Sequence, residues 1–201
     1  PNDILIWTDT FANNEESDLF KTSLADNNKN LSKENYEDVR VIISNPPYSA
    51  TQETTNDDNA NDHYDELDSR ISETYVAKTG AANKNKIYDS YIRAYRWASD
   101  RIENSGIIGF ITNAGWLEAL SANGMRKCMA EEFSSIYIYH LKGNQRTSGE
   151  RSRREGGKIF AEGSRAPIAM VFLVKNPNDP IKGKIFFHSV EFPGQKCGYR
   201  S

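Results

Sequence analysis

Continuous apolar runs are the feature of this sequence that most restricts its fold. Residues 39–44 and 106–112 carry neighbouring apolar and β-branched side chains, without the strict alternation of a strand that has one face in water. Such strands are typical of a mostly parallel α/β sheet with helices on both faces. Further strands are predicted at residues 4–7, 136–141, 168–174 and 184–190.

Helical patterns lie between these runs. In residues 86–104 an apolar stripe recurs every three or four positions, which is the period of a helix face; its members are Ile87, Tyr91, Tyr95, Ala98 and Ile102. A second helix is predicted over residues 116–133, with a buried face made of Leu117, Leu120, Met125, Met129 and Phe133. Alternating strands and helices predict an α/β fold.

The length of the chain, 201 residues, suits a single domain over residues 1–201. Two stretches do not fit the regular pattern, and long loops in compact domains are usually functional or disordered. Residues 50–69 contain seven acidic residues and no lysine or arginine, and residues 143–158 are rich in glycine and arginine. We expect both stretches to be mobile loops.

Several classes of protein are excluded by what the sequence lacks. No run approaches the roughly eighteen apolar residues of a membrane span, so no membrane is expected as a partner. Cys128 and Cys197 stand far apart, and His63, His140 and His188 have no ligand spacing, so no metal site is predicted. This cysteine usage favours a cytoplasmic protein.

The net charge of −3 conceals an asymmetry along the chain. The first hundred residues hold 10 basic and 19 acidic residues, and the remainder holds 15 and 9. A basic second half indicates a surface that faces a polyanion, although a solvated basic face is the commoner origin of such a bias.

The sharpest motif is Asn45-Pro46-Pro47-Tyr48, directly after the apolar run 39–44. The carboxyl ends of parallel strands are where open α/β sheets bind ligands. The prolines remove two amide donors and hold the backbone carbonyls rigidly, Asn45 adds a side-chain acceptor, and Tyr48 adds a flat ring. This set suits an amino group on a planar base, whereas the plain alternative is a turn that ends a strand.

With this motif the chain resembles adenine-N6 DNA methyltransferases of the γ arrangement, in which Asn-Pro-Pro-Tyr is catalytic. The likeness is closest to the methylase portion of Type ISP single-chain restriction-modification proteins. It extends over Trp7-Thr8-Asp9-Thr10-Phe11, Tyr88-Asp89-Ser90-Tyr91, Gly109-Phe110-Ile111-Thr112-Asn113 and Ile159-Phe160. The resemblance implies a Rossmann-like S-adenosylmethionine-dependent fold that here lacks its N-terminal strands.

The resemblance also implies a role for each residue of the motif. Asn45, through its side-chain oxygen, and Pro46, through its carbonyl, accept hydrogen bonds from the amino group of a flipped adenine, and Tyr48 stacks on the ring. Pro47 completes the catalytic motif. S-adenosylmethionine is the implied cofactor, and double-stranded DNA is the implied partner.

Other implied site residues have structural alternatives of nearly equal weight. Asp9 matches the acidic residue that binds the adenine amino group of the cofactor, or it ends a strand in a turn. Phe160 matches an aromatic residue that packs on the target base, or it closes a core. Weaker candidates are Asp89, Tyr91, Arg93 and Arg96 for the cofactor pocket, and Asn113 for a ligand contact or a helix cap.

Arginines in and near the second loop are candidates for contacts with DNA phosphates. They are Arg146, Arg151, Arg153, Arg154 and Arg165. A solvated flexible loop is the alternative interpretation of this group.

The glycine-rich loop that the family places before the Asp9 position does not occur in this sequence. The resemblance therefore implies a partial domain whose first strands lie upstream of Pro1, and which alone is inactive. In the longer protein it is joined to target-recognition parts and to helicase or nuclease domains. Two alternatives stay open: a methyltransferase with the same motif that acts on RNA or on protein glutamine, and a noncatalytic DNA-binding module.

Overall fold

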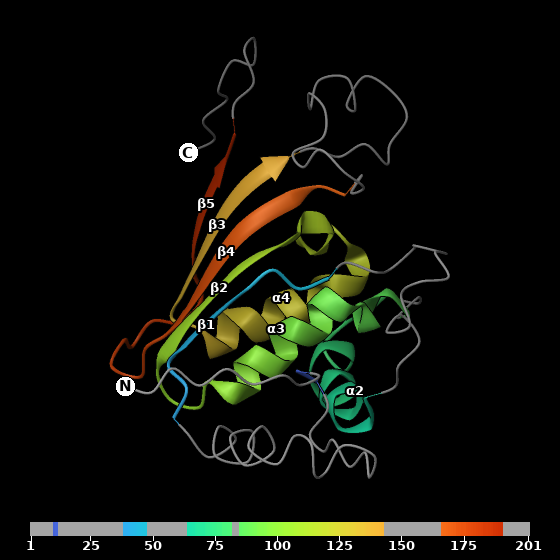
Figure 1. The fold of residues 1–201 in the computed structure, drawn as a ribbon, viewed down its shortest axis with the longest axis horizontal. Coiled ribbons are helices and arrows are strands. Elements are labelled where there is room, and N and C mark those ends of the chain that lie inside the picture. The colour runs from blue at the N-terminus through green and yellow to red at the C-terminus, as the bar shows by residue number, and fades with distance from the viewer. Residues whose placement is uncertain (1–9, 12–37, 48–63, 82–84, 143–165, 191–201) are drawn as a thin grey trace, which may run out of the picture.

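The fold is known from a computed structural model that describes residues 10–11, 38–47, 64–81, 85–142 and 166–190. These residues form a five-stranded sheet in the order β1-β2-β4-β3-β5 (Figure 1). β4 is antiparallel to both neighbours, whereas β1 pairs with β2 and β3 with β5 in parallel, so four strands share one direction. The predicted mostly parallel α/β sheet is confirmed. The strands are β1 (Val41–Ser44), β2 (Gly106–Asn113), β3 (Ser135–Lys142), β4 (Ile168–Lys175) and β5 (Lys184–Ser189).

Every predicted strand that falls within the described residues is present, with ends that differ by one or two residues. The segment predicted at residues 4–7 lies outside the described residues. Within β2 the side chains of Ile108, Phe110 and Thr112 are buried, while Ile107, the residue before Ile108, is 42% exposed. The two faces of the sheet therefore have different surroundings in the described part of the chain.

The helix predicted over residues 86–104 is confirmed as a 3-10 turn, η3 (Asn85–Tyr88), followed by α3 (Ser90–Arg101). Its apolar stripe faces the sheet, because all five members are buried: Ile87, Tyr91, Tyr95, Ala98 and Ile102. The ring of Tyr95 packs on Phe110 of β2 with centroids 5.0 Å apart. The core of the domain thus lies between β2 and α3.

Residues 116–133 do not form the single helix that the sequence predicts. Two 3-10 turns, η4 (Ala114–Leu117) and η5 (Leu120–Ala122), precede a shorter helix, α4 (Asn123–Glu132). Leu120, predicted to be buried, is 81% exposed in η5. The other predicted positions are buried or packed against the core: Leu117, Met125, Met129 and Phe133.

The irregular start of this region has a physical cause in α4. The carbonyl groups of Trp116 and Ala119 accept hydrogen bonds from the Arg126 side chain. Ala122 donates its backbone N–H to Ala119, which is the three-residue spacing of a 3-10 turn.

Residues 65–69, which the sequence places in an acidic mobile loop, are helical. They begin α2 (Asp65–Ile71), which continues into a π-helical turn, η2 (Ser72–Val76). Acidic side chains in a first turn are stabilised by the positive end of the helix dipole, so an acidic run is compatible with a helix start. Leu67 and Ile71 are buried and fix this helix on the core. Residues 50–63 of the stretch lie outside the described residues.

The described helices all lie on one side of the sheet (Figure 1). The sequence predicts helices on both faces, and in this part of the chain they cover one face. The other face carries apolar side chains on every strand, including Ile43 (80% exposed) and Phe172 (48%). Aromatic side chains stack across β3 and β5, with the Tyr137 and Phe186 centroids 4.7 Å apart.

The described residues lack two features that are typical of other kinds of protein. No helix in them is both long enough and apolar enough to cross a lipid bilayer. They also contain no group of three or more His, Cys, Asp or Glu side chains that could hold a metal ion.

Candidate functional site

The Asn45-Pro46-Pro47 segment follows β1 immediately, at the carboxyl end of that strand. Asn45 and Pro47 are exposed and Pro46 is buried. This arrangement leaves the Asn45 side chain accessible while its neighbour is held by packing. The segment therefore has the position that the sequence predicts for it, although its chemistry stays a prediction. Tyr48 lies outside the described residues.

The carboxyl end of β2 opens on the same edge of the sheet, because β1 and β2 are parallel and Ser44 pairs with Phe110. Asn113 ends β2, is 6% exposed, and accepts a hydrogen bond from the backbone N–H of Gly115 at 2.8 Å. The sequence left two roles open for Asn113, a ligand contact and a helix cap, and the structure shows the cap. The cap fixes the direction in which the chain leaves β2 into η4.

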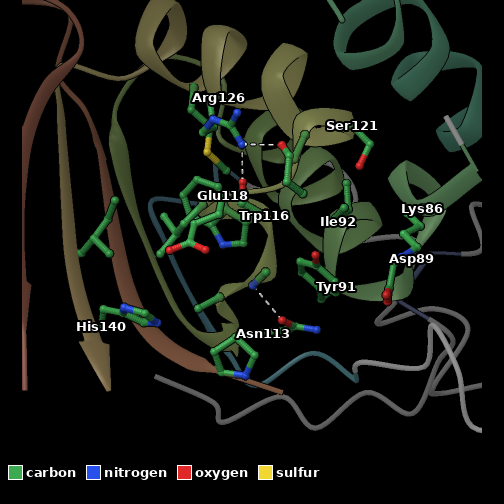
Figure 2. Close-up of a pocket in the computed structure, with 18 of the residues that line it drawn as sticks. Lys86, Asp89, Tyr91, Ile92, Asn113, Trp116, Glu118, Ser121, Arg126 and His140 are labelled. Atoms are coloured by element: carbon green, nitrogen blue, oxygen red, sulfur yellow. Dashed lines mark hydrogen bonds between the residues drawn. The ribbon is translucent and has the colours of Figure 1, made fainter. Parts of the chain in front are cut away.

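A cavity of about 580 Å³ lies beside this edge on the helical face of the sheet (Figure 2). Its walls come from η3 and the start of α3, from the loop between β2 and α4, and from β3 and β5. The polar side chains in its lining are Lys86, Asp89, Tyr91, Asn113, Glu118, Ser121, Arg126 and His140. Most of the remaining lining is apolar, which suits a flat organic group with a few polar edges.

The structure divides the weaker candidates on α3 into two groups. Asp89 and Tyr91 line the cavity, as Figure 2 shows. Arg93 and Arg96 are absent from its lining and form ion pairs with carboxylates instead, Arg93 with Asp68 and Arg96 with Asp100. Only the first two are therefore placed to touch a ligand in this cavity.

Arg126 was not singled out by the sequence analysis, yet it closes the roof of the cavity. Its Nη1 donates to the carbonyl oxygen of Trp116 and, at 2.9 Å, to that of Ala119 (Figure 2). Burial lowers the pKa of the Arg126 guanidinium below its ordinary value. The sequence signal that could have identified Arg126 is its position between Met125 and Met129, which are both buried on the same helix.

The histidines have separate surroundings. His140 of β3 lines the cavity, and His188 of β5 stacks on Tyr139 on the opposite face of the sheet, with centroids 5.3 Å apart. His63 lies outside the described residues.

Several predicted site residues fall on parts of the chain that the structure does not describe. They are Asp9, Tyr48, Phe160, Arg146, Arg151, Arg153, Arg154 and Arg165. Their roles stay predictions. The described residues thus provide the amino-group acceptors of the predicted site, while the residues predicted to bind the cofactor and DNA phosphates lie beyond them.

A mostly parallel α/β sheet with an Asn-Pro-Pro segment at a carboxyl strand end is the arrangement that the resemblance to amino-methyltransferases implies. Comparison with protein families gives a match over residues 2–146 to the Eco57I restriction-modification methylase family. Because this match covers more than half of the chain, the chain belongs to that family. Among curated proteins no sequence matches.

Three solved structures show the same fold. The cryo-EM structure of a DrdV-DNA complex matches at 43% identity and TM-score 0.75, over 83% of this chain. A nuclease-deletion mutant of the Type ISP restriction-modification enzyme LlaGI, in complex with a DNA substrate mimic, matches at 40% identity and TM-score 0.83, over 92% of this chain. The ATP-dependent Type ISP restriction-modification enzyme LlaBIII bound to DNA matches at 36% identity and TM-score 0.78, over 90% of this chain.

The matched regions are small parts of those proteins. They cover 16% of the DrdV chain, 15% of the LlaGI chain and 12% of the LlaBIII chain. The resemblance to restriction-modification methylases, and to Type ISP enzymes in particular, is confirmed.

Proposed function

We propose that the chain is the catalytic part of a DNA methyltransferase that moves a methyl group from S-adenosylmethionine to the N6 amino group of adenine. The observation that carries the proposal is the exposed Asn45 beside the buried Pro46 at the carboxyl end of β1. Membership of a restriction-modification methylase family supports it. The fragment alone is expected to be inactive, because the family's glycine-rich loop is absent from the sequence.

Asn45 and Pro46 activate the amino group by accepting its two N–H hydrogens, one on the side-chain oxygen and one on the backbone carbonyl. These hydrogen bonds draw the nitrogen lone pair out of conjugation with the ring and direct it at the methyl carbon. S-adenosylmethionine supplies a methyl group on a positively charged sulfur. The N–C bond forms as the C–S bond breaks, the sulfur keeps the electron pair, and the surplus proton leaves the nitrogen for water.

The other site residues that the sequence predicts bind the target base, the cofactor and the DNA backbone. Tyr48 and Phe160 hold the flipped adenine between aromatic faces, and Asp9 binds the adenine end of the cofactor. Arg146, Arg151, Arg153, Arg154 and Arg165 contact phosphates of double-stranded DNA, which makes binding sensitive to salt. We infer that in the full-length protein this part is covalently joined to target-recognition parts and to helicase or nuclease parts. The much longer relatives, one a nuclease-deletion mutant and one ATP-dependent, support this.

The test uses the full-length protein that contains this chain, unmethylated duplex DNA and S-adenosylmethionine with a labelled methyl group. We expect Asn45→Ala to reduce transfer by about 10²–10³-fold, the range for loss of one preorganised catalytic hydrogen bond. Asn104→Ala is the matched control, because Asn104 is an exposed asparagine just before the opposite end of β2. It should leave transfer unchanged.

The same assay separates the proposal from its alternatives. Label in RNA or in protein glutamine, with none in DNA, supports a different acceptor for the same motif. A full-length protein that binds DNA and transfers no methyl group to any acceptor is a noncatalytic binding module, and the proposal is then wrong.

A further inference from the structure

The side chain of Asn113 uses only one of its two polar atoms in the cap at the end of β2. Its Oδ1 accepts the hydrogen bond from the backbone N–H of Gly115 at 2.8 Å. Because a backbone N–H can only donate, the amide oxygen faces Gly115 and the Nδ2 group is turned the other way. Figure 2 shows this nitrogen on the side of the amide away from Gly115. The cap thus fixes the direction of a donor with two hydrogens.

This Nδ2 donor meets no hydrogen-bond acceptor within the described part of the chain. The Asn113 side chain belongs to a residue that is only 6% exposed, and it lines the cavity of about 580 Å³. Its nitrogen stays accessible from the cavity, unlike the indole nitrogen of Trp116 in the same wall, which is sealed off. Native proteins rarely leave such a donor unused, so it is suited to an acceptor on a ligand.

Asn113 and the Asn45-Pro46 pair lie at the same edge of the sheet. β1 and β2 are parallel neighbours with Ser44 opposite Phe110, and adjacent strands are about 4.8 Å apart. Asn45 follows Ser44 directly, and Asn113 is three residues beyond Phe110. A fixed donor at the end of β2 therefore lies beside the acceptors that follow β1.

An acceptor beside a donor is the complement of one edge of adenine. The amino group of adenine donates, and the ring nitrogens on either side of it, N1 and N7, accept. A single asparagine side chain often reads this pattern in DNA, because its amide carries both an acceptor and a donor. In this protein the two halves of the pattern come from different strand ends.

We propose that Asn113 binds a ring nitrogen of the target adenine through Nδ2. The ring edge of the base enters the cavity and its amino group stays at the end of β1, because Asn45 and Pro46 are not part of the cavity lining. This inference rests on the proposed function, because it takes the flipped adenine as the ligand. It gives Asn113 a contact with the substrate in addition to the cap.

A cap without any ligand contact is the competing explanation, and two substitutions separate the two roles. Asn113→Asp and Asn113→Ser keep an oxygen that can cap, because aspartate, serine and asparagine are about equally effective there. Both remove the amide donor. Asn104→Ser is the matched control, because Asn104 is exposed just before the opposite end of β2. A cap role alone predicts methyl transfer close to wild type in all three variants.

The experiment measures methyl transfer by the full-length protein to duplex DNA that contains adenine, 1-deazaadenine or 7-deazaadenine. Each analogue keeps the amino group and replaces one ring nitrogen by C–H. We expect the wild type to lose about tenfold in kcat/KM with the analogue that lacks the bound nitrogen, as for one neutral hydrogen bond. Asn113→Ser should lose a similar factor with adenine and nothing further with that analogue, whereas Asn104→Ser should behave as the wild type.

The decisive readout is this coupling between the side chain and one ring nitrogen, which a loss of stability does not produce. The thermal unfolding midpoint is measured beside it, and the coupling decides even where the midpoint falls. If both analogues act on Asn113→Ser as they act on the wild type, or if both Asn113 variants transfer at the wild-type rate, the contact is wrong and the proposed function stands. If the wild-type protein methylates no adenine, the proposed function and the contact fail together.

Discussion

The guanidinium of Arg126 on α4 donates a hydrogen bond to the backbone carbonyl of Trp116, ten residues earlier in the chain (Figure 2). A second bond from the same nitrogen reaches Ala119. These two bonds hold the loop between β2 and α4 over the cavity, in a region where the backbone forms short 3-10 turns in place of a long helix. One side chain therefore shapes the roof of the candidate site.

Replacing Arg126 by alanine should loosen that loop. Loss of the guanidinium leaves two partly buried carbonyl groups without this donor, which costs about 1–3 kcal/mol in the free energy of unfolding. Lys127→Ala is the control, because Lys127 is exposed on the same helix. Urea unfolding measures the stability, and amide hydrogen exchange over residues 114–122 reports the loop. Equal amide hydrogen-exchange rates over residues 114–122 in the two variants would show that Arg126 does not hold this loop in place.

The sequence revealed the strands and α3 because their patterns are local. Unbroken apolar runs mark strands whose interior is covered, and the stripe through Tyr95 marks one buried helix face. The region before α4 was not predictable in this way. Its turns depend on Arg126 reaching back to carbonyl groups seven and ten residues away, and hydrophobic periodicity carries no information about such a bond.

The acidic stretch shows a second limit of sequence patterns. Asp68 looked like part of a solvated loop, but it lies in the first turn of α2 and pairs with Arg93 of α3, which is twenty-five residues later. Conversely, Arg93 and Arg96 looked like cofactor ligands because of their helix. The positions of carboxylates on other elements decided their partners, and those positions are tertiary information. The strand-end location of Asn45 was predictable because the run before it defines the strand end.

Arg96 should be the most important ion-pairing residue for stability in this part of the chain. Its side chain is 2% exposed and pairs with Asp100 of α3 and Glu132 of α4. Removing one partner from a buried pair typically costs about 3–5 kcal/mol, so we expect a loss of this size in Arg96→Ala. Changing the more exposed Arg70 to alanine should lower the free energy of unfolding by at most about 1 kcal/mol. Similar urea midpoints for the two variants would contradict this ranking.

Asp100 should contribute to the acid sensitivity of the fold. Burial alone would raise the pKa of this carboxyl group, but hydrogen bonds and charge from Arg70 and Arg96 hold the pKa below its ordinary value of 3.8. A carboxyl whose pKa is depressed in the folded state adds stability above its unfolded pKa, and this contribution disappears as the pH falls through the folded pKa. Unfolding free energies at pH 7 and near pH 3 should therefore differ less in Asp100→Asn than in the wild type. An unchanged difference would mean that other carboxyls account for the whole acid effect.

Gly124→Ala should destabilise the protein, although alanine is the better helix former. A Cβ at this position of α4 would lie 1.8 Å from the carbonyl oxygen of Tyr75, a backbone atom that cannot turn aside. We expect a loss of about 3 kcal/mol, at the upper end for overpacking. Gly80→Ala is the control, since a Cβ there meets nothing within 4 Å among the described residues. Comparable thermal midpoints in both variants would show that α4 moves away from Tyr75 at little cost.

The most direct test of the proposed reaction is the chemical identity of the product. Duplex DNA is incubated with the full-length protein and S-adenosylmethionine carrying a deuterated methyl group, then digested to nucleosides for mass spectrometry. We predict that the deuterated methyl group appears on the N6 position of deoxyadenosine with the wild-type protein, and that it is nearly absent with Asn45→Ala. Labelled cytosine in place of adenine, or equal labelling by wild type and Asn45→Ala, would contradict the account.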